Sequence, residues 1–178
     1  MSHPDREAAI DALLDKQQIY EVLVKYCRGA DRGDADLIAD CYHPDAHENH
    51  GGTFEGPADE YVAMIRKVLP TAGTMTHLIT NILIELDGDK ARSECYITTF
   101  SRRGEAGSDD AFDSITSARL IDDFEKRSGA WKIAKRRLSW EWNHEMALRE
   151  TWGRGMIAPD PSVLVRGGKK PNDILYKD

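Results

Sequence analysis

The chain has 178 residues, of which 40% are apolar and 31% are charged, and its formal net charge at pH 7 is −7. This length fits one domain with its own hydrophobic core, and the composition is that of a globular protein rather than a disordered one. An acidic chain with scattered basic residues is repelled by nucleic acid and by anionic membranes, so we predict neither as a partner.

The apolar runs and the cysteines favour a cytoplasmic protein. The N-terminal sequence MSHPDREAAID has no apolar run of signal-peptide length, and no apolar run is long enough to cross a membrane. The cysteines Cys27, Cys41 and Cys95 are widely spaced and include no Cys-x-x-Cys pair. We therefore expect buried free thiols in a reducing compartment.

Helical periodicity dominates the first part of the chain. Apolar residues recur at three- and four-residue steps over 8–30, which predicts an amphipathic helix ending at the sequence GADRGD. Asp34 is placed to cap a second, short helix, which Pro44 is expected to stop. A short strand over 46–54 and a third helix over 57–70 follow.

Strand periodicity dominates the second part. The segments THLITNILIEL and ARSECYITTF flank Asp87-Gly88-Asp89, which predicts a hairpin with a tight turn. The segment 112–142 repeats the scheme with a turn at Ser128-Gly129, and the loop GEAGSDD joins the two hairpins. The order predicts an α+β domain in which a curved, mostly antiparallel sheet forms a half-barrel packed on three helices.

The sequence after about residue 150 has little periodicity. We predict a domain over 1–150 and an irregular extension over 151–178 that wraps the domain or a neighbouring subunit. The concave side of the half-barrel is expected to form a pocket against the helices, and this is where we look for chemistry.

The segment HPDAHENH, with His43, His47 and His50, raises the possibility of a metal site. On a strand His47 points to one face and His50 to the other, so the ligands diverge, and neither an HExxH nor an HxH pattern is present. We expect a polar edge strand and no metal, with His50 or Glu48 as an alternative substrate contact.

Asp31 and His77 are less conspicuous. Asp31 leaves the first helix beside its apolar stripe, and it could simply belong to a turn. His77 is expected to share a part-apolar strand face with Ile79, Asn81 and Leu83, where a histidine is commonly structural. If the two side chains meet, the carboxylate fixes the imidazole tautomer and makes its other nitrogen a general base.

Arg136 carries a charge on a largely apolar strand. Simple alternation places it on one face with four apolar side chains, Ala134, Leu138, Trp140 and Trp142. A guanidinium in such surroundings needs an anionic partner. This partner is either an acidic side chain such as Asp31 or Glu94, or the negative charge that develops on a leaving group or enolate.

The sequence has no motif for binding phosphate groups or nucleotides. The sequence has no GxSxG, no Walker loop and no GxGxxG, and its glycines fall in expected turns. We expect no cofactor.

Four segments together resemble a known family. They are IYEVLVKYCRGADRGDADLIADCYHPDA, FEGPADEYVAMI, MTHLITNILIEL and DDFEKRSGAWKIAKR. In this order they resemble the SnoaL-like branch of the nuclear-transport-factor-two superfamily, over about residues 8–145. The resemblance implies a cone-shaped α+β fold.

The resemblance also implies an activity. Within this branch the chain is similar to scytalone dehydratase, hexachlorocyclohexane dehydrochlorinase and the bile-acid dehydratases, which remove HX across a carbon–carbon bond without a cofactor. Their His–Asp dyad falls at His77 and Asp31, a bile-acid dehydratase tyrosine at Tyr26, and the leaving-group arginine of the dehydrochlorinase at Arg136. Where scytalone dehydratase has a second catalytic histidine, this chain has Cys95.

We therefore predict a cofactor-independent lyase for a small apolar, aromatic or cyclic substrate, in which His77 is the base and Asp31 its orienting group. Tyr26 and Arg136 would assist proton delivery or anion stabilisation. Further substrate contacts are predicted at His50, Tyr42, Cys95 and Trp140, and a homodimer or homotrimer is expected. A polyketide-cyclase or ketosteroid-isomerase-like enzyme and a non-catalytic small-molecule-binding protein are the alternatives.

Overall fold

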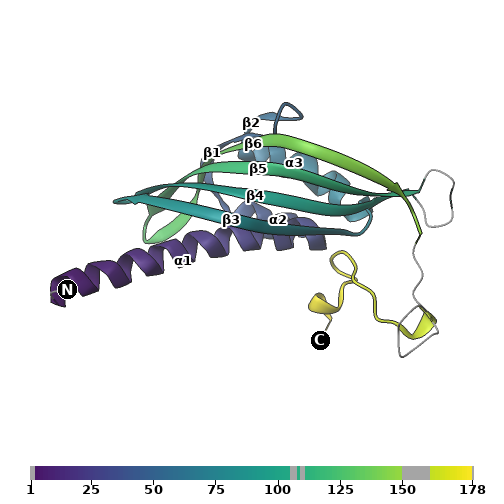
Figure 1. Cartoon of the computed structure of the whole chain (residues 1–178), viewed down its shortest axis with the longest axis horizontal. Coiled ribbons are helices and arrows are strands. Elements are labelled where there is room, and N and C mark those ends of the chain that lie inside the picture. The colour runs from purple at the N-terminus through teal and green to yellow at the C-terminus, as the bar shows by residue number, and fades with distance from the viewer. Residues whose placement is uncertain (1–2, 105–107, 109–110, 150–160, 178) are drawn as a thin grey trace.

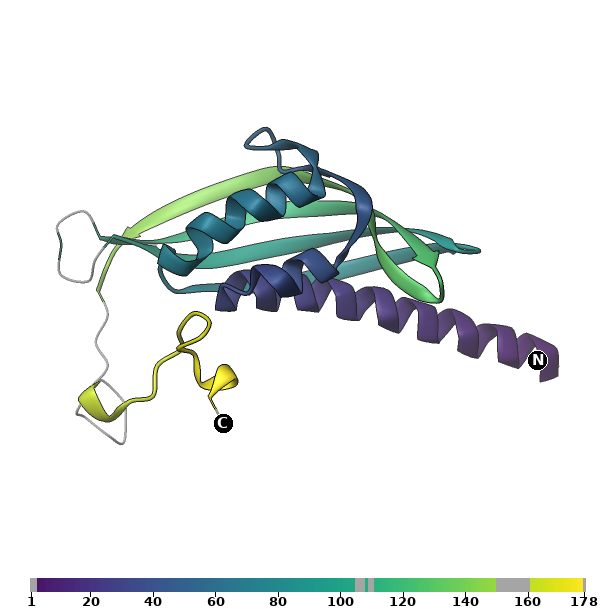
Figure 2. The same ribbon diagram turned by 180° about the vertical axis from the view of Figure 1, so that it is seen from behind.

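The computed structural model describes residues 3–104, 108, 111–149 and 161–177. A six-stranded sheet in the order β2-β1-β6-β5-β4-β3 curves around three helices that cover one of its faces (Figures 1 and 2). The predicted α+β class, with a curved sheet on three helices, is confirmed. The helices are α1 (His3–Arg32), α2 (Ala35–Asp40) and α3 (Ala58–Val68), and short 3-10 turns lie at Leu69–Thr71, Pro161–Val163 and Ile174–Tyr176. The strands are β1 (Tyr42–Asn49), β2 (Glu55–Pro57), β3 (Met75–Asp87), β4 (Lys90–Arg103), β5 (Phe112–Arg127) and β6 (Ala130–Ala147).

Helix α1 is longer than its buried stripe. Ile19, Leu23 and Tyr26 lie in the core, whereas Leu13 and Leu14 are exposed. The N-terminal end of the helix runs past the sheet (Figure 1). The predicted helix is confirmed, but its apolar face contributes to the core only in its second half. No described helix is both long and apolar enough to cross a membrane.

The segment after α1 follows the prediction at its start and departs from it at Pro44. The Asp34 side chain accepts a hydrogen bond from the Leu37 backbone N–H, as expected of a helix cap. Helix α2 then ends at Asp40, and Pro44 lies within β1 instead of stopping the helix. The strand tolerates this proline because its pairing with β6 is interrupted between Tyr42 and His47.

Strand β1 also differs from the expected polar edge strand. It lies between β2 and β6, parallel to β6, and its Glu48 side chain is fully buried. The edge is the three-residue strand β2, so most of HPDAHENH belongs to the interior of the sheet.

Both predicted hairpins form. Gly88 has φ = 58° in the turn between β3 and β4, and Ser128 and Gly129 have φ = 54° and 81° between β5 and β6. These left-handed conformations match the twist that a two-residue hairpin requires. The loop GEAGSDD, residues 104–110, lies largely outside the described residues.

A bulge in β3 changes which residues accompany His77. Asn81 has φ = 52°, and the pairing of β3 with β4 shifts between Thr80 and Leu83. Beyond this point the inward residues are Ile82, Ile84 and Leu86, which pack against the core. The prediction that Asn81 and Leu83 share the face of His77 is therefore wrong, and Leu83 is 60% exposed.

Two bulges in β6 act in the same way. Asp123 and Phe124 pair with Lys135 and Ile133, which leaves Ala134 as an extra residue, and Glu141 is extra between Trp140 and Trp142. As a result Arg136 shares its face with Leu138 and Trp140, whereas the predicted neighbours Ala134 and Trp142 do not lie on it.

The described part of the C-terminal segment packs against the end of α1. Lys169 Nζ donates to the main-chain oxygens of Ala30 and Asp31 at 3.2 and 3.1 Å, and the Tyr176 hydroxyl donates to Asp34. Residues 161–177 are largely irregular, and these contacts are made to their own chain. A domain boundary near residue 150 stays a prediction.

Candidate functional site

A cavity of about 320 Å³ lies between α1, α3 and the inner face of strands β3 to β6. Its wall contains Tyr26, His50, Tyr61, His77 and Trp140, so aromatic rings and two imidazoles face one space. A pocket is therefore present on the concave side of the sheet, where one was expected.

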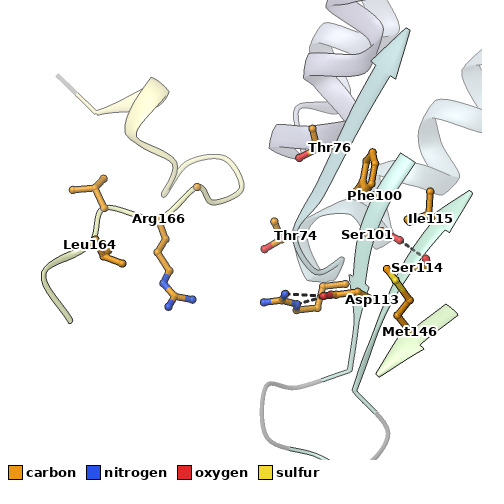
Figure 3. Close-up of a pocket in the computed structure, with 13 residues that line it drawn as sticks. Thr74, Thr76, Phe100, Ser101, Asp113, Ser114, Ile115, Met146, Leu164 and Arg166 are labelled. Carbon is orange, nitrogen blue, oxygen red and sulfur yellow. Dashed lines mark hydrogen bonds and ion pairs between the residues drawn. The ribbon is translucent and has the colours of Figure 1, made fainter. Parts of the chain in front are cut away.

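A larger cavity of about 540 Å³ lies elsewhere, between the C-terminal segment around Leu164 and Arg166 and the ends of the strands (Figure 3). An ion pair between Arg102 and Asp113, 2.8 Å apart, lies in its wall, and no histidine lines it. The smaller cavity therefore holds the groups with acid–base chemistry.

Asp31 and His77 meet at the edge of the smaller cavity. His77 Nδ1 donates to Asp31 Oδ1 at 2.6 Å, and the His77 backbone N–H lies 3.1 Å from both carboxylate oxygens. Their side chains are only 13% and 12% exposed. Because an ionised carboxylate only accepts hydrogen bonds, Nδ1 is the donor, and in the neutral imidazole Nε2 is the nitrogen with the free lone pair. Nε2 makes no hydrogen bond to the part of the chain that the structure describes.

Lys169 brings a cation to this pair. Its ammonium group binds the last carbonyls of α1, where the helix dipole favours a positive charge. Burial lowers the pKa of Lys169 to about 8, and the nearby charge of Asp31 opposes this shift. The C-terminal segment therefore supplies a positive charge beside Asp31, and no sequence pattern predicted this contact.

Aromatic side chains form the opposite wall. The hydroxyl groups of Tyr26 and Tyr61 are hydrogen-bonded at 2.8 Å, and the His50 ring stacks on Tyr61 with centroids 5.0 Å apart. Trp140 Nε1 donates to the carbonyl of Gly51 at 3.0 Å. Gly51 has φ = 60°, and a Cβ there would lie 2.5 Å from Trp140 Nε1, so only glycine fits under the indole.

The two tyrosines keep their protons. Burial raises the pKa of Tyr61 to about 12 and that of Tyr26 well above its usual value. Both phenols are therefore neutral near pH 7. One donates its hydrogen to the other, whose own hydrogen is available to a ligand.

Arg136 lies beneath the cavity and not in its wall. It is fully buried, and its Nε and Nη2 atoms donate to the two oxygens of Asp122 at 2.8 and 2.7 Å. Its guanidinium carbon lies 4.2 Å from the centre of the Tyr26 ring. The expected ion pair with an acidic side chain forms, but its partner is Asp122, because Asp31 binds His77 and Glu94 binds Arg119. Desolvation raises the pKa of Asp122, and the charge of Arg136 opposes that shift.

Two predicted substrate contacts also lie away from the cavity. Tyr42 is buried and donates its hydroxyl hydrogen to Glu48 Oε2 at 2.7 Å. Cys95 is fully buried in the core, and burial raises the pKa of its thiol to about 12. Thr99, which pairs with His77 across β3 and β4, lines the cavity.

The three histidines of HPDAHENH do not converge. His43 Nε2 is bonded to the carbonyl of Glu125 at 2.8 Å, and His50 Nδ1 to Glu48 Oε1 at 2.9 Å. Within the described ranges no three His, Cys, Asp or Glu side chains are grouped as a metal site would require. The expected burial of Cys27, Cys41 and Cys95 as free thiols is confirmed.

Residues 11–137 match the SnoaL-like domain family. The chain belongs to this family. Its curved, unclosed sheet around three helices is the cone-shaped fold that the resemblance implied. No curated protein matches the chain in sequence.

Solved structures share the fold of this SnoaL-like domain. A type 2 hexachlorocyclohexane dehydrochlorinase aligns with a TM-score of 0.71 and 18% identity, over 83% of this chain and 99% of its own. A type 3 enzyme of that name from Novosphingobium barchaimii gives 0.68 and 19%, over 78% and 94%. A protein from Novosphingobium aromaticivorans, provisionally assigned as a scytalone dehydratase, gives 0.67 and 18%, over 78% and 91%. At these identities the likeness shows the fold alone.

Sequence reasoning missed several residues of the SnoaL-like cavity. Tyr61 and Asn143 both line the cavity, and neither was predicted as a site residue. The amide of Asn143 donates to Thr116 Oγ1 at 2.8 Å. Asn143 faces inward only because of the bulge at Glu141, which the sequence does not mark. Tyr61 could have been predicted from the sequence, because it is a tyrosine on a helix that was expected to cover the pocket.

Proposed function

We propose that this SnoaL-like domain is a cofactor-independent lyase that eliminates water or HX from a small apolar or cyclic substrate. The observation that supports it is the 2.6 Å hydrogen bond between Asp31 Oδ1 and His77 Nδ1 at the wall of a cavity. This bond leaves His77 Nε2 as a base and gives Asp31 the role of fixing its tautomer and orientation.

The reaction needs a base and an apolar space. His77 Nε2 takes a proton from carbon, the C–H electrons form the new double bond, and the bond to the leaving group breaks. Such a base contributes about 10²–10⁴-fold, and the remainder has to come from positioning in the cavity. Rings such as Tyr61 and Trp140 suit a cyclic or aromatic substrate.

Tyr26 and Arg136 receive different roles in this proposal. The Tyr26 phenol lines the cavity and is placed to hydrogen-bond substrate. Arg136 does not line the cavity, and its Nε and Nη2 are bound to Asp122, so it does not contact substrate. Its positive charge lies under the Tyr26 ring and stabilises negative charge in the cavity electrostatically.

The probe 3-(4-nitrophenoxy)cyclohexanone tests the proposal, because proton removal beside the carbonyl expels coloured 4-nitrophenolate and leaves cyclohexenone. We expect turnover above the spontaneous rate, with the product identified by its mass. His77→Ala should lower kcat/KM by about 100-fold or more, and Asp31→Asn should lower it less. His144→Gln is the matched control, because His144 is an exposed histidine next to the inward Asn143 on β6.

The same probe separates the alternatives. Exchange of the proton beside the carbonyl for deuterium from D₂O, without release of nitrophenolate, favours a cyclase- or isomerase-like enzyme. Saturable binding with neither exchange nor release favours a binding protein.

The remaining expectations form part of the proposal. They are activity without added cofactor or metal, a cytoplasmic location and a homodimer or homotrimer. Turnover after treatment with a chelator, and the mass in solution from light scattering, test the first and the last.

A further inference from the structure

The cavity has a second imidazole–carboxylate pair that the proposed elimination does not yet use. His50 Nδ1 is bonded to Glu48 Oε1 at 2.9 Å, and the His50 ring lines the same cavity as His77. We propose that His50 is the general acid of the reaction and gives its Nε2 proton to the leaving group, while His77 takes the proton from carbon. This inference rests on the proposed lyase function and adds a catalytic residue to it.

The position of His50 is fixed from two sides. Glu48 and His50 are two residues apart at the end of β1, and Glu48 Oε2 is held by the Tyr42 hydroxyl at 2.7 Å. The ring stacks on Tyr61 with an interplanar angle of 26°. Its side chain is 22% exposed, and Nε2 has no hydrogen-bond partner among the residues that the structure describes. Nε2 is therefore available to a ligand.

The buried charges assign the acid to His50. Arg136, Asp122 and Glu48 are all fully buried, and the charge of Arg136 is matched by its two bonds to Asp122. This leaves the carboxylate of Glu48 as one excess negative charge in the interior. Its two bonded partners are Tyr42, whose pKa burial raises well above its usual value, and His50. In its imidazolium form, which an acid requires, His50 makes an ion pair with Glu48 across this 2.9 Å contact.

The carboxylate of the other pair, Asp31 with His77, has more partners. The carboxylate of Asp31 also accepts the His77 backbone N–H and lies near the ammonium group of Lys169. Asp31 therefore has partners besides the His77 side chain, and the neutral imidazole with its proton on Nδ1 offers Nε2 as the base. One cavity thus combines an imidazole suited to taking a proton with one suited to giving it.

The sheet brings the two imidazoles to the cavity from opposite sides. His77 is on β3, and His50 follows β1, which is separated from β3 by β6, β5 and β4. An elimination can use two such groups, because the base acts on a C–H bond and the acid acts on the bond to the leaving group at the neighbouring carbon. The electrons of the C–H bond form the C=C bond, those of the C–O bond stay on oxygen, and the proton of His50 completes water or an alcohol. Return of a proton from His77 to His50 through solvent closes the cycle.

Two substrates that differ in their leaving group test the inference. Hydroxide from 3-hydroxycyclohexanone needs a proton to leave, whereas 4-nitrophenolate from 3-(4-nitrophenoxy)cyclohexanone leaves readily without one. We expect His50→Gln to lower kcat for the hydroxy substrate by about 100-fold and for the nitrophenoxy substrate by less than about 3-fold. Glu48→Gln should shift the ratio of the two rates in the same direction. His77→Ala should lower both rates, and His144→Gln should change neither.

The ratio of the two rates keeps the test valid if a variant folds poorly. Both rates come from one preparation, so the folded fraction cancels. Equal losses on the two substrates in His50→Gln, or no loss on either, would overturn the acid role of His50 and leave the proposed lyase intact. If the wild-type protein eliminates neither leaving group, the proposed lyase function falls, and this inference falls with it.

Discussion

Replacement of Arg136 by methionine should cost a large part of the stability of the protein. Arg136 and Asp122 are both fully buried and are joined by two hydrogen bonds of 2.8 and 2.7 Å. Arg136→Met leaves the Asp122 carboxylate in the interior without its cation, and removal of one partner from such a pair costs about 3–5 kcal/mol. With a urea m-value of about 2 kcal/mol/M, the unfolding midpoint should fall by roughly 2 M.

The loss should depend on pH with a definite sign. Desolvation already raises the pKa of Asp122, and Arg136→Met removes the charge that opposes this shift. The folded variant then holds a proton that the unfolded chain releases above about pH 4, so its free energy of unfolding falls as pH rises. The deficit relative to wild type should therefore be smaller at pH 5 than at pH 8, as measured by urea unfolding followed by circular dichroism.

A double variant supplies the control. Arg136→Met with Asp122→Leu removes both charges and keeps apolar volume, so it should recover most of the loss, because an apolar pair replaces a buried ion pair at little cost. A loss below about 1 kcal/mol in Arg136→Met, or a double variant no more stable than the single one, would refute the reasoning.

Two further predictions concern Lys169 and Asn81. Burial lowers the pKa of Lys169 from 10.5 in the unfolded chain to about 8 in the folded protein. Between these two pH values the unfolded chain binds more protons at Lys169 than the folded protein does. The contribution of Lys169 to the free energy of unfolding should therefore rise with pH. The melting temperature of wild type minus that of Lys169→Met, followed over this range, should increase; a flat difference contradicts the assignment. Asn81→Val should cost about 1–2 kcal/mol in urea unfolding because Asn81 has φ = 52°, whereas Asn81→Gly should be nearly neutral.

The local sequence was sufficient for the element types. The hairpin turns at Gly88 and at Ser128-Gly129 and the cap at Asp34 depend on neighbours within a few positions, and all formed as expected. Helix α1 also formed, although only its second half contributes to the core. The failure at Pro44 has a non-local reason. A proline is tolerated in β1 only because the pairing with β6 is interrupted there, and β6 is some ninety residues away in the chain.

The pairing of β5 with β6 cannot be predicted by counting residues from the turn. From the turn, Arg127 pairs with Ala130 and Phe124 with Ile133, so continued alternation would place Asp122 opposite Lys135. The extra residue in β6 moves Arg136 opposite Asp122 instead. One inserted residue thus decides which cation is buried with Asp122.

The sequence by itself determined the helices, the hairpins and the α+β class, because periodicity and turn chemistry act over short distances. Its resemblance to a family also singled out Asp31 and His77. Only the tertiary structure decided that these two side chains meet, that Arg136 binds Asp122, and that His50 shares a buried carboxylate with Tyr42. The physical reason is that bulges reset the inward face of a strand, and that buried charges take the partner that the packing of distant segments brings within hydrogen-bond distance.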